Sequence, residues 1–194
     1  MDAKSYSRFI SYKNSLTAAD MIDKKYTLNE RFEFRNILSC EADQAAETEA
    51  VCFPPNEACP KEAMIERALK VPELFLVAAD RQSGLIAGFL NGIATDEEVF
   101  DDKFFTDTGL HKPDGQNIML LGLDVLPEYR RQGLASEIMR RYAQREAEKG
   151  RARLILTCLD EKIPMYEKMG FEDLGLSASF WGGQAWHEME LKLN

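Results

Sequence analysis

One stretch decides the fold of this chain: L-G-L-D-V-L-P-E-Y-R-R-Q-G-L-A-S, from Leu121 to Ser136. Its first residues predict an apolar strand, and a turn of the form R-x-x-G-x-A then opens a long helix. Because Gly133 and Ala135 carry almost no side chain, the phosphates of a ligand can approach the backbone there. The first N–H groups of a helix lack partners within it, and the helix dipole favours negative charge at that end. The stretch therefore predicts a phosphate site, with Arg130 and Arg131 as fixed cations.

Two better-known phosphate motifs are excluded by the same residues. The stretch lacks the G-K-[ST] ending of a Walker loop, and it contains no G-x-G-x-x-G of a dinucleotide-binding turn. R-x-x-G-x-A is by itself a weak motif, since glycine is common near helix starts.

The flanking segments predict a mixed α/β fold. Apolar runs and alternation predict strands at 32–37, 74–79, 85–92, 117–125, 154–158 and twice within 171–193. Helix formers and amphipathic spacing predict helices at 42–51, 60–69, 134–149 and 163–169. We expect one domain over 32–194, an N-terminal extension over 1–31, and a long acidic loop or short helical insert over 95–116.

Composition excludes several classes of protein. The chain has 194 residues, 45% hydrophobic and 29% charged, and no apolar run long enough to span a membrane. Its net charge of −9 argues against nucleic-acid binding. Eight basic and four acidic side chains nevertheless gather between Glu128 and Arg153. This basic island suits a polyanionic cofactor, or it is only a solvated helix face.

The four cysteines form no C-x-x-C pair and lie near no cluster of histidines. We therefore predict no metal site, and reduced, mostly buried thiols in a cytoplasmic protein.

A second motif follows the phosphate turn at a fixed distance: P-M-Y-E-K-M-G-F, from Pro164 to Phe171. With the R-x-x-G-x-A turn and the intervening helix and strand, it resembles the GNAT superfamily of N-acetyltransferases. The resemblance implies a mixed central sheet with an antiparallel meander, splayed central strands and flanking helices.

Several shorter matches resemble one branch of that superfamily, the aralkylamine N-acetyltransferases. They are F-E-F-R from Phe32, E-T-E-A from Glu47, Cys59-Pro60, V-P-E-L from Val71, and W-H-E-M from Trp186.

The resemblance implies acetyl-CoA as cosubstrate. Backbone groups of Leu123 and Val125 would pair with the pantetheine arm, with Asp124 between them. The pyrophosphate would be held by N–H groups of the turn and first helical residues: Arg131, Gln132, Gly133, Leu134, Ala135 and Ser136. Tyr166 would lie beside the cofactor and protonate the departing thiolate, for which a phenol with a pKa near 10 is suited. The alternative is a tyrosine that only packs in the core.

The implied substrate pocket combines two loops and one strand. Its candidate residues are Phe53, Thr157, Trp181, Gln184 and Trp186, whose aromatic rings suit an aryl group or a cation.

The paired histidines of the branch fall on Met119 and Leu121, which accept no proton. An alkylammonium has a pKa near 10, so another group must deprotonate it. The candidates are Asp124, Asp160, Glu161 and His187. Strict strand alternation predicts that Asp124 faces away from Met119 and Leu121.

We therefore predict an N-acetyltransferase acting on a small primary amine, such as an arylalkylamine, as a monomer or homodimer without nucleic-acid or membrane partners. The alternatives are a polyamine or protein amino-group acetyltransferase and a CoA-binding module that has lost catalysis.

Overall fold

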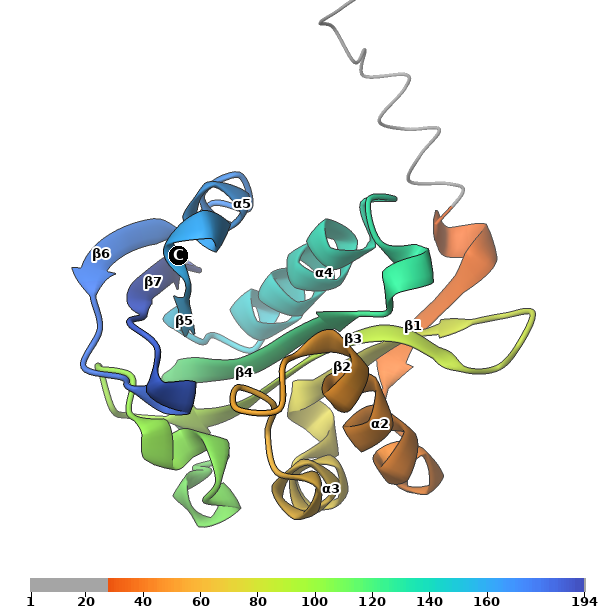
Figure 1. Ribbon diagram of the computed structural model, residues 1–194, viewed down its shortest axis with the longest axis horizontal. Helices are drawn as coiled ribbons and strands as arrows, with labels where there is room; N and C mark the ends of the chain where they lie inside the picture. The colour runs from red at the N-terminus through yellow and green to blue at the C-terminus, as the bar shows by residue number, and fades with distance from the viewer. Residues whose placement is uncertain (1–27, 194) are drawn as a thin grey trace, which may run out of the picture.

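A seven-stranded sheet forms the centre of the computed structural model, which describes residues 28–193 (Figure 1). Its strands lie in the order β1-β2-β3-β4-β5-β7-β6, and only β4 and β5 run parallel. The strands are β1 (Phe32–Asn36), β2 (Phe75–Asp80), β3 (Ile86–Thr95), β4 (Asn117–Val125), β5 (Arg153–Cys158), β6 (Glu172–Leu176) and β7 (His187–Lys192). The predicted mixed sheet is confirmed. Residues 1–27, most of the predicted N-terminal extension, lie outside the described residues.

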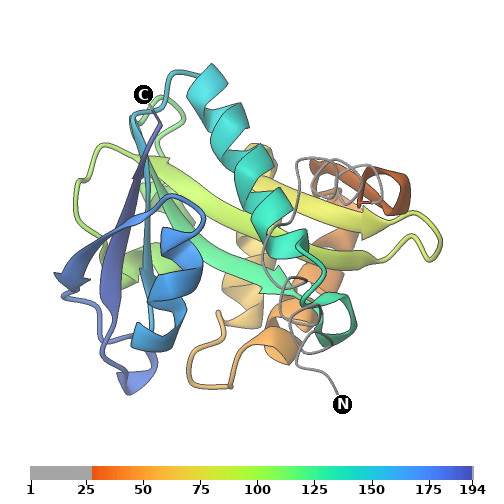
Figure 2. The same ribbon diagram turned by 90° about the horizontal axis from the view of Figure 1, so that it is seen from above.

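Helices cover both faces of this sheet. They are α2 (Ala42–Cys52), α3 (Lys61–Lys70), α4 (Leu134–Glu148) and α5 (Ile163–Glu167). Helix α4 lies across one face, α2 and α3 lie on the other, and α5 lies beside β5–β7 (Figures 1 and 2). Leu134, Ile138 and Tyr142 of α4 are buried as their helical spacing predicts. Helix α5 ends two residues before the predicted end, since Phe171 and Gly170 already turn back onto it through N–H bonds to Tyr166 and Glu167.

The insert between β3 and β4 contains two short 3-10 helices, η3 (Asp102–Phe105) and η4 (Thr108–Leu110). Its aromatic residues Phe100, Phe104 and Phe105 are buried with Met119 and Leu121 of β4. Of the two predicted alternatives, a long acidic loop or a short helical insert, the structure shows the helical insert. Its phenylalanines form part of the core on the face of the sheet that α2 and α3 cover.

Strands β4 and β5 diverge after a short parallel ladder. Their pairing joins Asn117–Met119 only to Arg153–Ile155, although β4 continues to Val125 and β5 to Cys158. The splayed central strands that the resemblance implied are thus present. Beyond Met119, the edge of β4 that faces β5 has no strand partner.

A β-bulge in β4 reverses the alternation of its side chains. Asn91 of β3 pairs with Gly122, whereas the next residue, Gly92, pairs with Leu120, so Leu121 is an extra residue. Asp124 consequently lies on the same face as Met119 and Leu121. The prediction that Asp124 faces away from them is wrong, because strict alternation does not survive a bulge.

Within residues 28–193, no helix is long and apolar enough to cross a membrane, and no three His, Cys, Asp or Glu side chains are grouped for a metal ion. All four cysteines are free thiols. Cys59 and Cys158 are buried, Cys52 is half-buried and Cys40 is exposed, so only two of the four fit the expected burial.

Candidate functional site

The turn before α4 has an unusual backbone. It is left-handed at Arg131 (φ 61°) and again at Gly133 (φ 85°), and Gly133 is the N-cap of the helix. No side chain caps this end, and a Cβ added at Gly133 would meet no atom within 4 Å. The N–H groups of the first helical residues are therefore left without a side-chain cap, and such an uncapped helix start fits an anion.

The two neighbouring polar side chains of this turn are held in place. The Nε of Arg130 donates to the carbonyl of Val125 at 2.8 Å. The Nε2 of Gln132 donates to the carbonyl of Glu128 at 3.0 Å, and its Oε1 accepts a bond from Arg31. Arg130 is thus a cation anchored to the end of β4, whereas no hydrogen bond or ion pair within residues 28–193 anchors the exposed side chain of Arg131.

Leu123 and Val125 lie in the splayed part of β4. They pair with Leu90 and Gly88 of β3, on the side of the strand away from β5. Both side chains pack toward the core under α4. The other edge of this segment is free of β5, so an extended chain can be accommodated beside it.

Tyr166 projects from α5 toward the ends of these strands. Its ring packs edge-on against Phe171, with centroids 5.7 Å apart. Burial raises the pKa of Tyr166, and the neighbouring Cys158 and Asp124 raise it further. The phenol therefore keeps its proton at neutral pH, close to the carboxyl end of both β4 and β5.

Two loops meet over the face that carries Met119 and Leu121. Asn56, in the loop after α2, donates to the carbonyl of Gly182 at 2.8 Å. The indole of Trp181 donates to the carbonyl of Glu57 at 2.7 Å and packs against Phe105. The loop 53–59 and the loop 177–186 are thus tied together beside the aromatic insert.

The predicted substrate residues distribute over this region. Trp186 donates to the carbonyl of Trp181 at 2.8 Å, so the structure brings these two together. Thr157 has the strand parity of Ile155, which belongs to the Met119 cluster. Phe53 follows α2, and the exposed Gln184 follows the Trp181 turn, so both lie on the two tied loops.

Three of the four candidate bases lie near the carboxyl end of β5 and have charged partners. His187 contacts Asp173 through Nδ1 and Asp160 through Nε2, both at 2.9 Å. Glu161 pairs with Lys162 at 3.0 Å. His187 is the first residue of β7, and these contacts hold the start of the strand against β6 and the segment after β5. They agree with a structural histidine.

The fourth candidate, Asp124, belongs to a buried polar network that sequence reasoning did not find. Asp124 is 0% exposed, and Glu49 of α2 lies beside it at 3%. Arg67 of α3, 1% exposed, donates to Asn91 Oδ1 at 2.8 Å and to the carbonyl of Phe105 at 2.6 Å. A signal for Glu49 did exist: it continues the buried stripe of Ala42, Ala45 and Ala46 at helical spacing.

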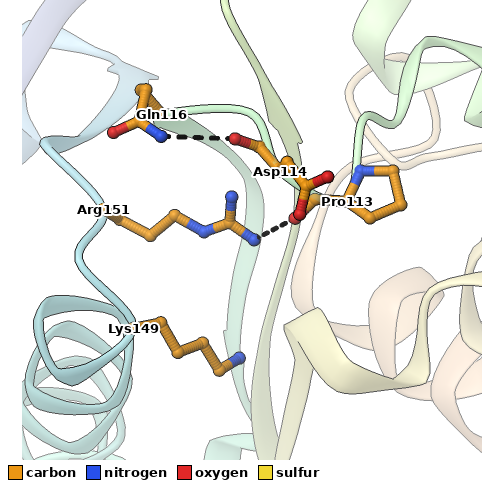
Figure 3. A pocket seen from close by; sticks show the side chains of 5 residues that line it. All are labelled: Pro113, Asp114, Gln116, Lys149 and Arg151. Carbon is orange, nitrogen blue, oxygen red and sulfur yellow. Dashed lines mark hydrogen bonds between the residues drawn. The ribbon is translucent and has the colours of Figure 1, made fainter.

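A separate polar hollow lies at the other end of α4 (Figure 3). It is lined by Pro113, Asp114, Gln116, Lys149 and Arg151. Arg151 donates to the carbonyls of Pro113 and Gly115, and Lys149 pairs with Glu146. Because both cations are engaged and the phosphate turn is at the opposite end of the helix, this hollow is not part of the candidate site.

Comparison with known proteins shows the family to which this chain belongs. Residues 40–171, more than half of the chain, match the acetyltransferase (GNAT) family. The chain belongs to the GNAT family. The predicted family is confirmed.

One curated relative of this GNAT protein is the serotonin N-acetyltransferase of Mesocricetus auratus. It is 30% identical over 113 residues, which cover 58% of this chain and 53% of the relative. The chain thus spans about half the length of the curated relative that it matches.

Solved structures share the GNAT fold at low identity. The loading GNATL domain of CurA from Lyngbya majuscula has a TM-score of 0.71 at 14% identity and covers 84% of this chain and 98% of its own. A putative acetyltransferase of Salmonella typhimurium, yncA, was solved with its cofactor acetyl-CoA. It has a TM-score of 0.60 at 15% identity, and the match covers 84% of this chain and 94% of yncA. At these identities the likeness shows the fold alone.

Proposed function

We propose that this GNAT protein transfers an acetyl group from acetyl-CoA to the primary amine of a small molecule, with arylalkylamines as the preferred class. The observation that carries the proposal is the doubly left-handed turn at Arg131 and Gly133, which opens α4 beside the splayed strands β4 and β5. A phosphate cradle and an unpaired strand edge, side by side, fit the two ends of one extended, phosphorylated cosubstrate.

The residues present fit acetyl-CoA at both ends. Uncapped N–H groups from Gly133 to Ser136 suit the pyrophosphate, and Arg131 supplies a cation there. The free edge of β4 at Leu123 and Val125 suits amide groups of the pantetheine arm, which would pair there as an added strand does. Among the solved GNAT structures, yncA from Salmonella typhimurium and a phosphinothricin acetyltransferase from Sinorhizobium meliloti were obtained with acetyl-CoA.

The chemistry assigned to this chain is positioning and proton transfer. When bound, acetyl-CoA supplies an activated acetyl group as a thioester, which a neutral amine attacks directly. Tyr166 holds a proton on its hydroxyl that can pass to the departing thiolate. The raised pKa of Tyr166 keeps that proton in place across the neutral range.

The substrate class rests on the aromatic lining. The face around Met119 and Leu121 is bounded by Phe104, Phe105 and Trp181. Flat apolar rings favour an aryl group, and the acidic chain, with a net charge of −9, attracts a cationic amine over distance. The serotonin N-acetyltransferase of Mesocricetus auratus, by its name, acts on an arylalkylamine.

The test is thiol release from acetyl-CoA with tryptamine, tyramine, spermidine and a lysine-containing peptide between pH 6 and 10. We expect turnover with the two arylalkylamines and at least tenfold lower kcat/KM with the others. Turnover only with spermidine or the peptide would keep the reaction and replace the substrate. Binding of acetyl-CoA by calorimetry, without turnover of any amine, would support the CoA-binding module instead.

A further inference from the structure

The bulge in β4 places two buried carboxyl groups side by side. Asp124 Oδ2 and Glu49 Oε2 lie 3.1 and 3.2 Å from the position that a Cβ would occupy on Gly122. The Nδ2 of Asn91 lies 3.0 Å from the same point, and Gly122 itself has no side chain to separate the two carboxyl groups. One comes from the splayed part of β4 and the other from α2, and both lie on the face of Met119 and Leu121.

Three of the four carboxyl oxygens of this pair lack a hydrogen-bond donor. Both oxygens of Asp124 and the Oε2 of Glu49 are buried without a hydrogen-bond partner, whereas the Oε1 of Glu49 accepts the N–H of Cys59 at 3.0 Å. Ionised carboxylates only accept hydrogen bonds, so two of them cannot satisfy each other. A single proton between Asp124 and Glu49 turns one group into a donor and removes one buried negative charge.

One buried cation lies beside the pair. It is Arg67 of α3, next to Glu49, whereas Arg130, which approaches Asp124 from the turn after β4, is exposed to solvent. The other titratable groups facing the pair are Cys52 of α2, Cys59 of the following loop and Tyr166 of α5.

Burial raises the pKa of Asp124 well above its ordinary value, and the charge of Glu49 raises it further. Burial also raises the pKa of Glu49. Burial, and after it the nearby Asp124, raises the pKa of Cys52 to about 12, so this thiol stays neutral.

We propose that Asp124 and Glu49 form a carboxyl pair that holds one proton and accepts a second from the ammonium group of the substrate. The inference rests on the proposed N-acetyltransferase function and supplies the proton acceptor that Met119 and Leu121 cannot provide. Asp124, on the splayed strand, takes the proton from nitrogen while its own proton passes to Glu49. The ammonium becomes a neutral amine, and the pair becomes fully protonated and neutral. Asp124 is the catalytic residue, and Glu49 is the positioning residue.

The decisive experiment compares Asp124→Asn with the wild type on tryptamine and on spermidine, from pH 6 to 10. A general base contributes roughly 10²-fold or more, so we expect kcat/KM of the variant to fall by about that factor at pH 7. Near pH 10 much of the amine is already neutral, so the deficit should shrink there to less than about tenfold. A deficit that is the same at every pH would indicate a structural role and overturn the proposal.

Matched variants separate this effect from folding. Glu47→Gln alters an exposed carboxyl on the same helix and should follow the wild type at every pH. Affinity for CoA, measured by calorimetry, should be unchanged within about twofold in Asp124→Asn if the variant is folded and the cofactor site intact. A pH-dependent deficit in Glu47→Gln as large as that of Asp124→Asn would contradict the assignment.

The shared proton can also be tested in the absence of any amine substrate, independently of the proposed acetyltransferase activity. Infrared difference spectra of wild type against Asp124→Asn should contain the carbonyl band of a protonated carboxyl at pH 7, and Glu49→Gln should move its titration to lower pH. Failure of every amine with this band present would refute the proposed function, not the shared proton. Absence of the band at pH 7 would overturn the shared proton.

Discussion

Asn91 of β3 pairs with Gly122 of β4, and its Oδ1 accepts a hydrogen bond from the buried guanidinium of Arg67. Its Nδ2 approaches the carbonyl of Gly122 at 3.4 Å. This one asparagine joins the strand pair at the bulge to helix α3. It therefore fixes the point where side-chain alternation in β4 changes, on which the face of Asp124 depends.

Replacement of Gly133 by alanine should weaken CoA binding. A left-handed conformation costs a non-glycine residue about 1 kcal/mol, and the added methyl group occupies the open side of the phosphate turn. We expect CoA to bind about tenfold more weakly by calorimetry, equivalent to about 1.4 kcal/mol.

Gly150→Ala is the matched control for this change. Gly150, at the other end of α4, has φ 80° and open space around its Cα, so the backbone cost is similar. Both variants should lose a few degrees of Tm, on the order of 2–4 °C. Equal CoA affinities for the two variants would refute the phosphate turn.

Tyr166→Phe should lower kcat without changing CoA affinity. The variant keeps the ring packed on Phe171 and removes only the hydroxyl group that carries the proton. Loss of a general acid predicts a decrease of about 10²-fold in steady-state kcat.

Tyr142→Phe is the control for this change and should lower stability without lowering kcat. The hydroxyl of this buried tyrosine donates to the carbonyl of Leu74 at 3.1 Å, in the core under α4. We expect it to reduce the free energy of unfolding by about 1 kcal/mol in urea and to leave kcat unchanged. If Tyr166→Phe behaves in the same way, Tyr166 only packs in the core.

Gly182→Ala should raise the KM for the amine. An added Cβ would lie 2.6 Å from the carbonyl oxygen of Asn56, so the two tied loops must move apart. We expect an increase in amine KM of roughly tenfold, from loss of about 1–2 kcal/mol of binding, with CoA affinity unaltered.

Gly183→Ala controls for the backbone of that turn. Gly183 also has a positive φ, 75°, but a Cβ there meets no atom within 4 Å. A rise in KM that is equally large in Gly183→Ala would show that the contact between the loops does not shape the amine site.

Stability should depend on pH through His187. A hydrogen bond to Asp173 raises the pKa of His187, and the charges of Asp173 and Asp160 raise it further. A group whose pKa is higher in the folded state stabilises most below its unfolded pKa of about 6.5, and this contribution disappears as pH rises through the folded value. The difference in Tm between wild type and His187→Gln should therefore be larger at pH 6 than at pH 9. A constant difference over this range would refute the ion-paired histidine.

Much of the architecture was predictable from local pattern. The strand at 117–125 and the helix from Leu134 coincide with β4 and with the start of α4. Their signals are local: an apolar run stopped by Pro127, and helical spacing that begins after Gly133 and ends before Gly150. The turn before α4 was visible because Gly133 and Ala135 leave the backbone open and Arg130 and Arg131 supply positive charge.

Other features of the site were not predictable from such patterns. The phenylalanines of the acidic insert pack against Met119 only after the insert has folded back onto the sheet. Helical spacing indicates that Glu49 lies on the buried stripe of α2, but it does not reveal its partner Asp124, which lies on a distant strand.

The sequence alone determined the main elements, their order, the glycine-containing turn before α4 and the family, since periodicity and turn chemistry act between residues close in the chain. Only the tertiary structure decided which face of β4 carries Asp124, because a bulge arises from the register between two strands. It also decided that Asp124 meets Glu49 and that loop 53–59 is tied to loop 177–186. These are contacts between segments far apart in the chain, and packing of the whole sheet against its helices brings them together.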